Sequence, residues 1–115
     1  MGRKILFITT DQQRYDALGC NGGTIARTPV LDALSRAGIT FDRAHPQNVV
    51  CMPSRSTMLT GQHVSTHGVW MNGVPLPEDA PSIAADLRGA GYATALIGKA
   101  HFEPLLDPFL RFTEN

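Results

Sequence analysis

Short apolar runs that alternate with helical patterns restrict the fold of this chain more than any other feature of its 115 residues. Residues 4–9 form an apolar run of large side chains between polar neighbours, which predicts a buried strand. Residues 39–44 and 92–97 predict a second and a third strand, and the third is rich in apolar and small side chains. Helical patterns lie between these runs.

Three segments have the apolar spacing of α-helices. The first, at residues 29–37, follows a threonine suited to a helix cap and begins with proline, which a helix start accepts. The second is expected at residues 54–60, with Met58 and Leu59 on its inner side, and the third at residues 81–88. Strands alternating with helices predict an α/β fold with a mainly parallel sheet flanked by helices.

Composition and charge exclude several classes of function. Ten Lys and Arg residues are matched by ten Asp and Glu residues without a basic run, so a nucleic-acid surface is not expected. Cys20 and Cys51 are too few and too far apart for a disulfide framework. The first apolar run is too short for a signal peptide or a membrane span, which predicts a cytoplasmic location and no membrane partner. The oligomeric state stays open.

The length of the chain allows one domain at most. Three strands would leave at least one edge of the sheet open, and natural proteins avoid exposed edges. Residues 104–112 also carry five large apolar side chains with no evident partner. We therefore expect residues 1–115 to be the N-terminal part of a larger enzyme, with a fold that is incomplete as given.

Polar side chains follow the first and the third predicted strands. Asp11 and Gln12 come directly after residues 4–9, and Lys99 and His101 come after the third strand. Ligand sites of open α/β sheets lie beyond the carboxyl ends of the strands. The sequence therefore predicts a site at this edge of the sheet.

The run around Cys51 is the most specific motif of the chain, and it reads Cys51-Met52-Pro53-Ser54-Arg55 followed by Thr60-Gly61. A cysteine-dependent phosphatase would place arginine six positions after the cysteine, but Thr57 stands there and Pro53 interrupts the loop. A buried small side chain is the commonest role of an isolated free cysteine. Here, however, the cysteine is not isolated, because Pro53, Ser54, Arg55, Thr60 and Gly61 follow it in a fixed pattern.

This run resembles the activating segment of the sulfatase family, in which the cysteine is oxidised to formylglycine after translation. Three further elements of that family stand in the family's order along this chain. Two precede Cys51: an apolar strand ending in a metal ligand at residues 5–12 and a helix introduced by Thr28-Pro29. A Gly-Lys-x-His pattern at residues 98–101 comes after it. The resemblance covers nearly the whole chain. It implies an alkaline-phosphatase-like α/β fold, with residues 1–115 as the N-terminal part of a sulfatase catalytic domain.

The resemblance also implies a reaction and roles for single residues. Formylglycine made from Cys51 would be hydrated; one hydroxyl would attack sulfur, and the other would expel sulfate from a covalent sulfated formylglycine. Arg55 would donate a charge-assisted hydrogen bond to the diol. Lys99 and His101 would bind the sulfate oxygens and balance charge in the transition state.

Asp11 and Gln12 offer the oxygen ligands that hard divalent cations take in proteins. With residue 51 as a third ligand, the resemblance implies a metal site, for Ca²⁺ first and for Mn²⁺ or Mg²⁺ as alternatives. It also implies two partners: a small-molecule sulfate ester as substrate, and a formylglycine-generating enzyme that binds transiently and modifies Cys51.

Two features of the chain favour different substrates. Asp11-Gln12 resembles the start of phosphonate monoester hydrolases and choline sulfatases, whereas the Lys99-x-His101 pattern is one that phosphonate hydrolases tend to lack. We expect a sulfuric ester hydrolase, with a phosphonate or phosphate monoester hydrolase as the alternative. A second alternative is an inactive fragment, because family members take further metal ligands from later in the chain.

Four more residues have both a structural and a functional interpretation. Asn72 is either a substrate contact or part of an Asn-Gly turn. His63 and His67 stand four residues apart, as metal-binding histidines do, but neighbouring glycines favour loop or packing roles. Trp70 is expected in the core rather than in a substrate pocket.

Overall fold

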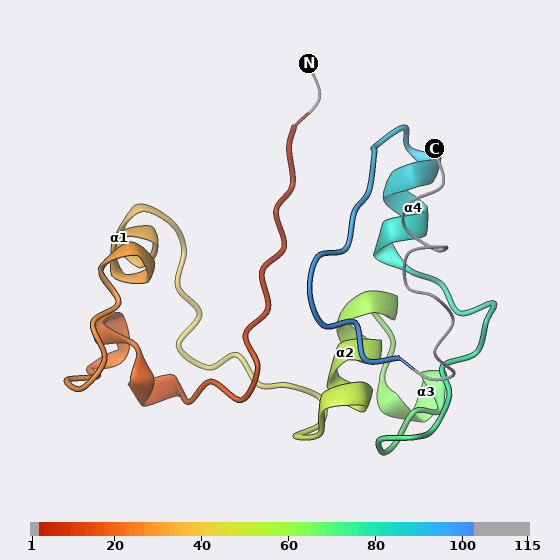
Figure 1. Cartoon of the computed structure of the whole chain (residues 1–115), viewed down its shortest axis with the longest axis horizontal. Coiled ribbons are helices and arrows are strands. Elements are labelled where there is room, and N and C mark those ends of the chain that lie inside the picture. The colour runs from red at the N-terminus through yellow and green to blue at the C-terminus, as the bar shows by residue number, and fades with distance from the viewer. Residues whose placement is uncertain (1–2, 103–115) are drawn as a thin grey trace. The chain divides into compact units, whose positions relative to one another are not determined.

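A computed structural model describes residues 3–102 of the chain (Figure 1). The chain forms two compact units, Met1–Ala44 and His45–Asn115. The predicted apolar tail at residues 104–112 lies outside the described residues. Among residues 3–102, no helix is long and apolar enough to cross a lipid bilayer.

The first unit contains two 3-10 helices, η1 (Tyr15–Ala17) and η2 (Gly19–Asn21), and the helix α1 (Pro29–Ala37). None of the described residues of this unit is buried, and hydrogen bonds rather than an apolar core join its helices. The Thr28 hydroxyl accepts from the Gly19 N–H at 2.8 Å and donates to Asp32 Oδ1 at 2.9 Å. Asp32 Oδ1 also accepts from the Cys20 N–H at 2.8 Å, so one carboxylate ties η2 to α1. The hydrogen bond from Thr28 holds the pKa of Asp32 below its ordinary value.

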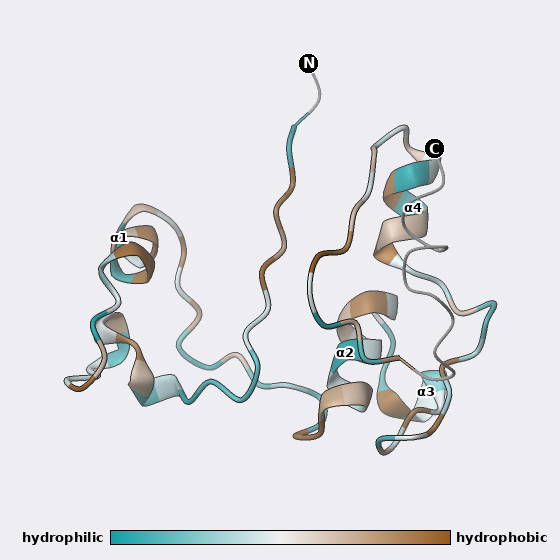
Figure 2. Ribbon diagram, in the orientation of Figure 1, coloured by the Kyte–Doolittle hydropathy of each residue, from teal (hydrophilic) through white to brown (hydrophobic). Residues whose placement is uncertain are grey.

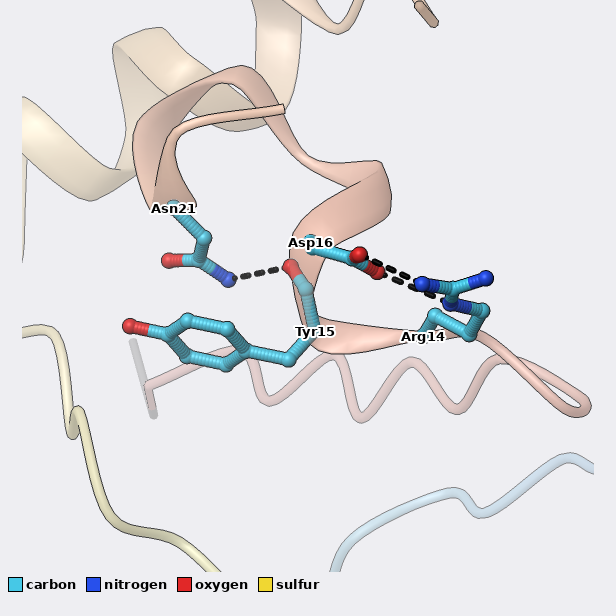
Figure 3. A network of polar contacts seen from close by, with 4 residues as sticks. All are labelled: Arg14, Tyr15, Asp16 and Asn21. Atoms are coloured by element: carbon cyan, nitrogen blue, oxygen red, sulfur yellow. Dashed lines mark hydrogen bonds and ion pairs between the residues drawn. The ribbon is translucent and has the colours of Figure 1, made fainter. Parts of the chain in front are cut away.

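A small polar network orders the loop that follows Asp11 and Gln12 (Figure 3). Arg14 Nε donates to Asp16 Oδ1 at 2.9 Å, and a second bond makes the ion pair bidentate. Asn21 Nδ2 donates to the Tyr15 carbonyl at 3.0 Å and joins η2 to η1. Because the ion pair is exposed, its contribution to stability is small, and its main effect is to fix the local backbone.

The second unit contains α2 (Cys51–Thr60), α3 (Val64–His67) and α4 (Ile83–Gly89), and α2 contacts both other helices (Figure 1). Its core consists of Met52, Val69 and Leu76, which are 5% exposed or less. Partly buried apolar side chains pack around them, namely Leu59, Val74, Ala80 and Phe102. Cys51, the candidate nucleophile, therefore stands next in sequence to a core residue, Met52.

Local sequence signals predicted where the helices lie better than the residues at which each helix begins and ends. α1 has the expected residues, with proline at its start and Gly38 at its end. α2 begins at Cys51, three residues before the predicted start, because proline is tolerated within the first turn. The interpretation of Met58 as an inward-facing residue is wrong: Met58 is 44% exposed, while Leu59 packs against the core. At α4 the Ser82 hydroxyl accepts from the Ala85 N–H at 3.1 Å and starts the helix at Ile83.

The three predicted strands have no assigned strand structure, and the second contains a turn at residues 42–43. Residues 3–102 contain no assigned strand at all, so the parallel sheet is not confirmed. The brown stretch that follows the N-terminus in Figure 2 is the first apolar run, where Leu6 is 83% and Ile8 72% exposed. Ile39 and Ile97, in the other two segments, are 85% and 96% exposed. A strand forms only when a second strand supplies the hydrogen bonds of a ladder, and none of these segments has such a partner among the described residues.

Candidate active site

Cys51 is the first residue of α2, and its side chain is a half-buried free thiol. The chain enters this helix with extended backbone at Val50, and Gly61 ends it in the left-handed region at φ 68°. Because α2 starts at Cys51, Arg55 stands about one helical turn away from it. The motif residues thus lie on one short, packed element.

Arg55 links α2 to the second predicted site segment. Its Nη1 donates to the backbone carbonyl of Lys99 at 2.7 Å, although the two residues are 44 positions apart in the sequence. A hydrogen bond from a charged guanidinium is about twice as strong as one between neutral groups. The structure therefore brings the Cys51 motif and the Gly-Lys-x-His pattern together in one unit.

The backbone around Lys99 is unusual. Gly98 has φ 98°, and His101 has φ 56°, a conformation that few residues other than glycine adopt. Nδ1 of His101 is buried without a hydrogen-bond partner among the described residues. A buried polar atom of this kind costs free energy, and such backbone and side-chain strain gathers at functional sites. The positive φ and the unpaired Nδ1 both belong to His101, which is half-buried, while Lys99 is exposed.

Asn72 contacts the start of α2. Its Oδ1 accepts from the Met52 N–H at 3.0 Å. The turn interpretation also holds, because Gly73 has φ 88° and the Val74 N–H is bonded to the Met71 carbonyl at 3.4 Å. The neighbouring Gly73 N–H contacts Met52 Sδ at 3.1 Å, which seats this turn on the core. Sequence periodicity carries no signal for such a long-range contact.

His67 has a packing role, as favoured from the sequence. It is 3% exposed, and its Nδ1 accepts from the buried Val69 N–H at 3.1 Å. Nε2 therefore carries the proton of the neutral ring and donates to Thr57 Oγ1 at 3.0 Å, which ties α3 to α2. Burial lowers the pKa of His67. His63 is exposed and lies 3.0 Å from Gln47 Oε1.

The candidate metal ligands are divided between the units: Asp11 and Gln12 are exposed residues of the first, and Cys51 belongs to the second. Gln12 has φ 52°, so the backbone turns sharply directly after Asp11. Within residues 3–102, no three His, Cys, Asp or Glu side chains gather into a metal-binding group. The carboxylate and amide oxygens nevertheless match the chemistry of a hard divalent cation.

Trp70 differs from its predicted place. It was expected in the core, but it is 63% exposed, while the preceding Val69 is fully buried. Extended chain turns successive side chains to opposite sides, so burial of Val69 directs Trp70 outward. The interpretation of Trp70 as a core residue is therefore wrong.

Comparison with known proteins identifies the family. The sulfatase family model matches residues 3–106, so this chain belongs to the sulfatase family. No solved structure was found to match it. Membership of the family implies the alkaline-phosphatase-like α/β fold, although helices are the only regular elements among residues 3–102.

Several curated relatives are similar to most of this chain. An ulvan-active sulfatase of Formosa agariphila is 38% identical over 99 residues, which cover 86% of this chain and 19% of the relative. An arylsulfatase of Clostridium perfringens is 34% identical, with 100% of this chain and 26% of the relative covered. A multifunctional alkaline phosphatase superfamily protein, PehA of Trinickia caryophylli, is 36% identical over 92% of this chain and 21% of its own length. The chain spans about a fifth of the length of the first relatives it matches.

Proposed function

We propose that this chain forms the N-terminal part of a sulfuric ester hydrolase that acts through formylglycine made from Cys51. The observation that carries the proposal is the 2.7 Å bond from Arg55 to the Lys99 carbonyl, because it joins the two motifs that the chemistry requires. The family and relatives named as sulfatases support the same reaction class. Within this proposal the three apolar segments belong to the sheet of an alkaline-phosphatase-like domain.

Residue 51, once oxidised and hydrated, would supply one hydroxyl that attacks sulfur and displaces the alcohol. The second hydroxyl would then lose its proton and re-form the aldehyde, which breaks the C–O bond to sulfate and releases it. Arg55, one turn along α2, would donate to that group and favour its deprotonated form. Lys99 and His101 would bind the anionic oxygens of the ester and offset the charge that moves to the leaving oxygen. A formylglycine-generating enzyme is the transient partner that this scheme needs.

A divalent metal fits the donor chemistry of Asp11 and Gln12, with residue 51 as a third ligand. When bound, it would stabilise negative charge on the reacting oxygens. Hard cations take six or more oxygen ligands, so these three residues alone leave the coordination incomplete. For this reason we expect the 115 residues by themselves to have weak or no activity.

Phosphonate or phosphate monoesters are the second candidate substrates. Similarity to PehA and the Asp11-Gln12 pair favour them. The Lys99-x-His101 segment favours sulfate, because phosphonate hydrolases tend to lack this pair.

The test compares aryl and alkyl sulfates with phenyl phosphonates as substrates of the full-length protein, produced with a formylglycine-generating enzyme. A Cys51→Ala variant is the matched control, because it removes only the residue to be modified. We expect sulfate esters to be cleaved faster and the variant to be inactive. Faster phosphonate cleavage would mean that the substrates are phosphonate esters rather than sulfate esters. Parental activity of Cys51→Ala would overturn the formylglycine mechanism.

A further inference from the structure

The helix that carries Cys51 cannot cap its own N-terminus. Its cap residue is Val50, whose side chain has no acceptor, and no capping bond from that side chain exists. Pro53 has no N–H, and the Ser54 N–H is bonded to the Val50 carbonyl at 3.1 Å. The N–H groups of the first turn therefore need acceptors from elsewhere.

Two asparagine side chains supply acceptors on both sides of Cys51. Asn48 Oδ1 accepts from the Val50 N–H at 2.8 Å, and Asn72 Oδ1 accepts from the Met52 N–H at 3.0 Å. Since an N–H needs an oxygen opposite it, these contacts also fix which way each amide is turned. The residues immediately before and after Cys51 are thus both held by asparagine amides.

The Asn72 contact has a rigid support. Met52 is 1% exposed, and its sulfur contacts the N–H of Gly73, the residue that follows Asn72. Asn72 therefore reaches α2 from a turn that is itself seated on the core. A loosely held side chain would lose more conformational entropy in making the same bond.

We propose that Asn48 and Asn72 are positioning residues that hold residue 51 in its reactive geometry, and that their neutral amides avoid placing negative charge beside an anionic substrate. The inference rests on the proposed function. Aspartate caps a helix as well as asparagine does and complements the helix dipole better. Its charge, however, would weaken the attraction of the helix N-terminus for a sulfate ester. A neutral asparagine amide caps the helix and adds no negative charge beside the substrate.

The test uses the full-length protein with four variants: Asn48→Ala, Asn72→Ala, Asn72→Asp and, as the matched control, Asn21→Ala. Asn21 is an asparagine of the first unit, where its Nδ2 donates to the Tyr15 carbonyl. Amide hydrogen exchange of Val50 and Met52 reports the caps without any need for activity. Steady-state kinetics with an alkyl sulfate, corrected for the measured formylglycine content, report the position of residue 51.

In Asn72→Ala we expect exchange at Met52 to quicken about fivefold and kcat to fall by a similar factor, with KM little changed. Asn48→Ala should do the same at Val50. Asn72→Asp should keep parental exchange, because it keeps the acceptor, but should lower kcat/KM several-fold at low salt and less at high salt. The control should behave as the parent.

Exchange and turnover of both alanine variants equal to those of Asn21→Ala would overturn the positioning role. A rise in KM alone for Asn72→Ala, with parental exchange, would make Asn72 a substrate contact instead. If Asn72→Asp matched the parent at all salt concentrations, the argument for neutral caps would be wrong. A parent that cleaves no sulfate ester would refute the proposed function, while the exchange measurement would still decide whether the asparagines cap α2.

Discussion

Acid should destabilise the second unit through His67, whose burial between α2 and α3 disfavours the charged ring. The neutral ring accepts from Val69 through Nδ1 and donates to Thr57 through Nε2. Protonation would place a second N–H on the ring, opposite the Val69 donor, in a residue that is 3% exposed. The native state therefore resists the protonation that the unfolded chain undergoes.

The sign and size follow from proton linkage. The pKa of His67 in the native state lies below its ordinary value of 6.5. As the pH falls through 6.5, the unfolded state binds a proton that the native state does not, so stability decreases. Each pH unit between the unfolded and native pKa values removes up to about 1.4 kcal/mol. This contribution to the free energy of unfolding is fully present above the unfolded pKa, and it is lost progressively as the pH falls from there through the lower native pKa.

The assay is amide exchange at Val69 in the parent and in His67→Gln, measured from pH 7.5 to 5 and corrected for intrinsic rates. Thr57→Val is a second variant, which leaves the Nε2 proton without an acceptor and should cost about 1–3 kcal/mol at any pH. We expect the parent to lose protection on acidification more steeply than His67→Gln. Equal pH slopes in the two proteins would refute the reasoning, because the remaining histidines are common to both.

Three further substitutions and one control test single residues. In the full-length protein, Asp11→Asn should lower divalent-cation affinity and activity together, and parental turnover at limiting metal would return Asp11 to a turn residue. Gly23→Ala should destabilise the full-length protein by about 1–3 kcal/mol in denaturant unfolding, because its Cβ would lie 2.5 Å from the backbone carbonyl oxygen of Asp16. Gly89→Ala, which meets nothing within 4 Å, is the control and should be neutral or slightly stabilising. Lys99→Ala should reduce kcat/KM by roughly a hundredfold, and a change under threefold would argue against a role at the sulfate oxygens.

The sequence predicted those parts of the fold that local interactions decide. The Thr-Pro start and the glycine end of α1 are signals within a few residues of the helix, and both marked its limits correctly, although the Thr28 side chain makes no capping bond. The predicted start of α2 at residue 54 was three residues late, because the first turn of a helix accepts Pro53, whose missing N–H is not needed there.

The rest depends on contacts between distant residues. A strand needs a partner strand, so the apolar pattern at residues 4–9 indicates a tendency that the described chain does not fulfil. The exposure of Met58 and Trp70 likewise depends on what packs against them. In the candidate site, the motif pointed to Arg55, but its bond to the Lys99 carbonyl could not be read from spacing.

Peptide mass spectrometry of residue 51 tests the central claim most directly. The full-length protein is produced with a formylglycine-generating enzyme, digested and treated with a hydrazide probe and a thiol alkylating reagent. The account predicts that the Cys51 peptide carries an aldehyde that reacts with the probe, and that Pro53→Ala lowers the converted fraction. A peptide that stays fully alkylatable under these conditions would contradict the account.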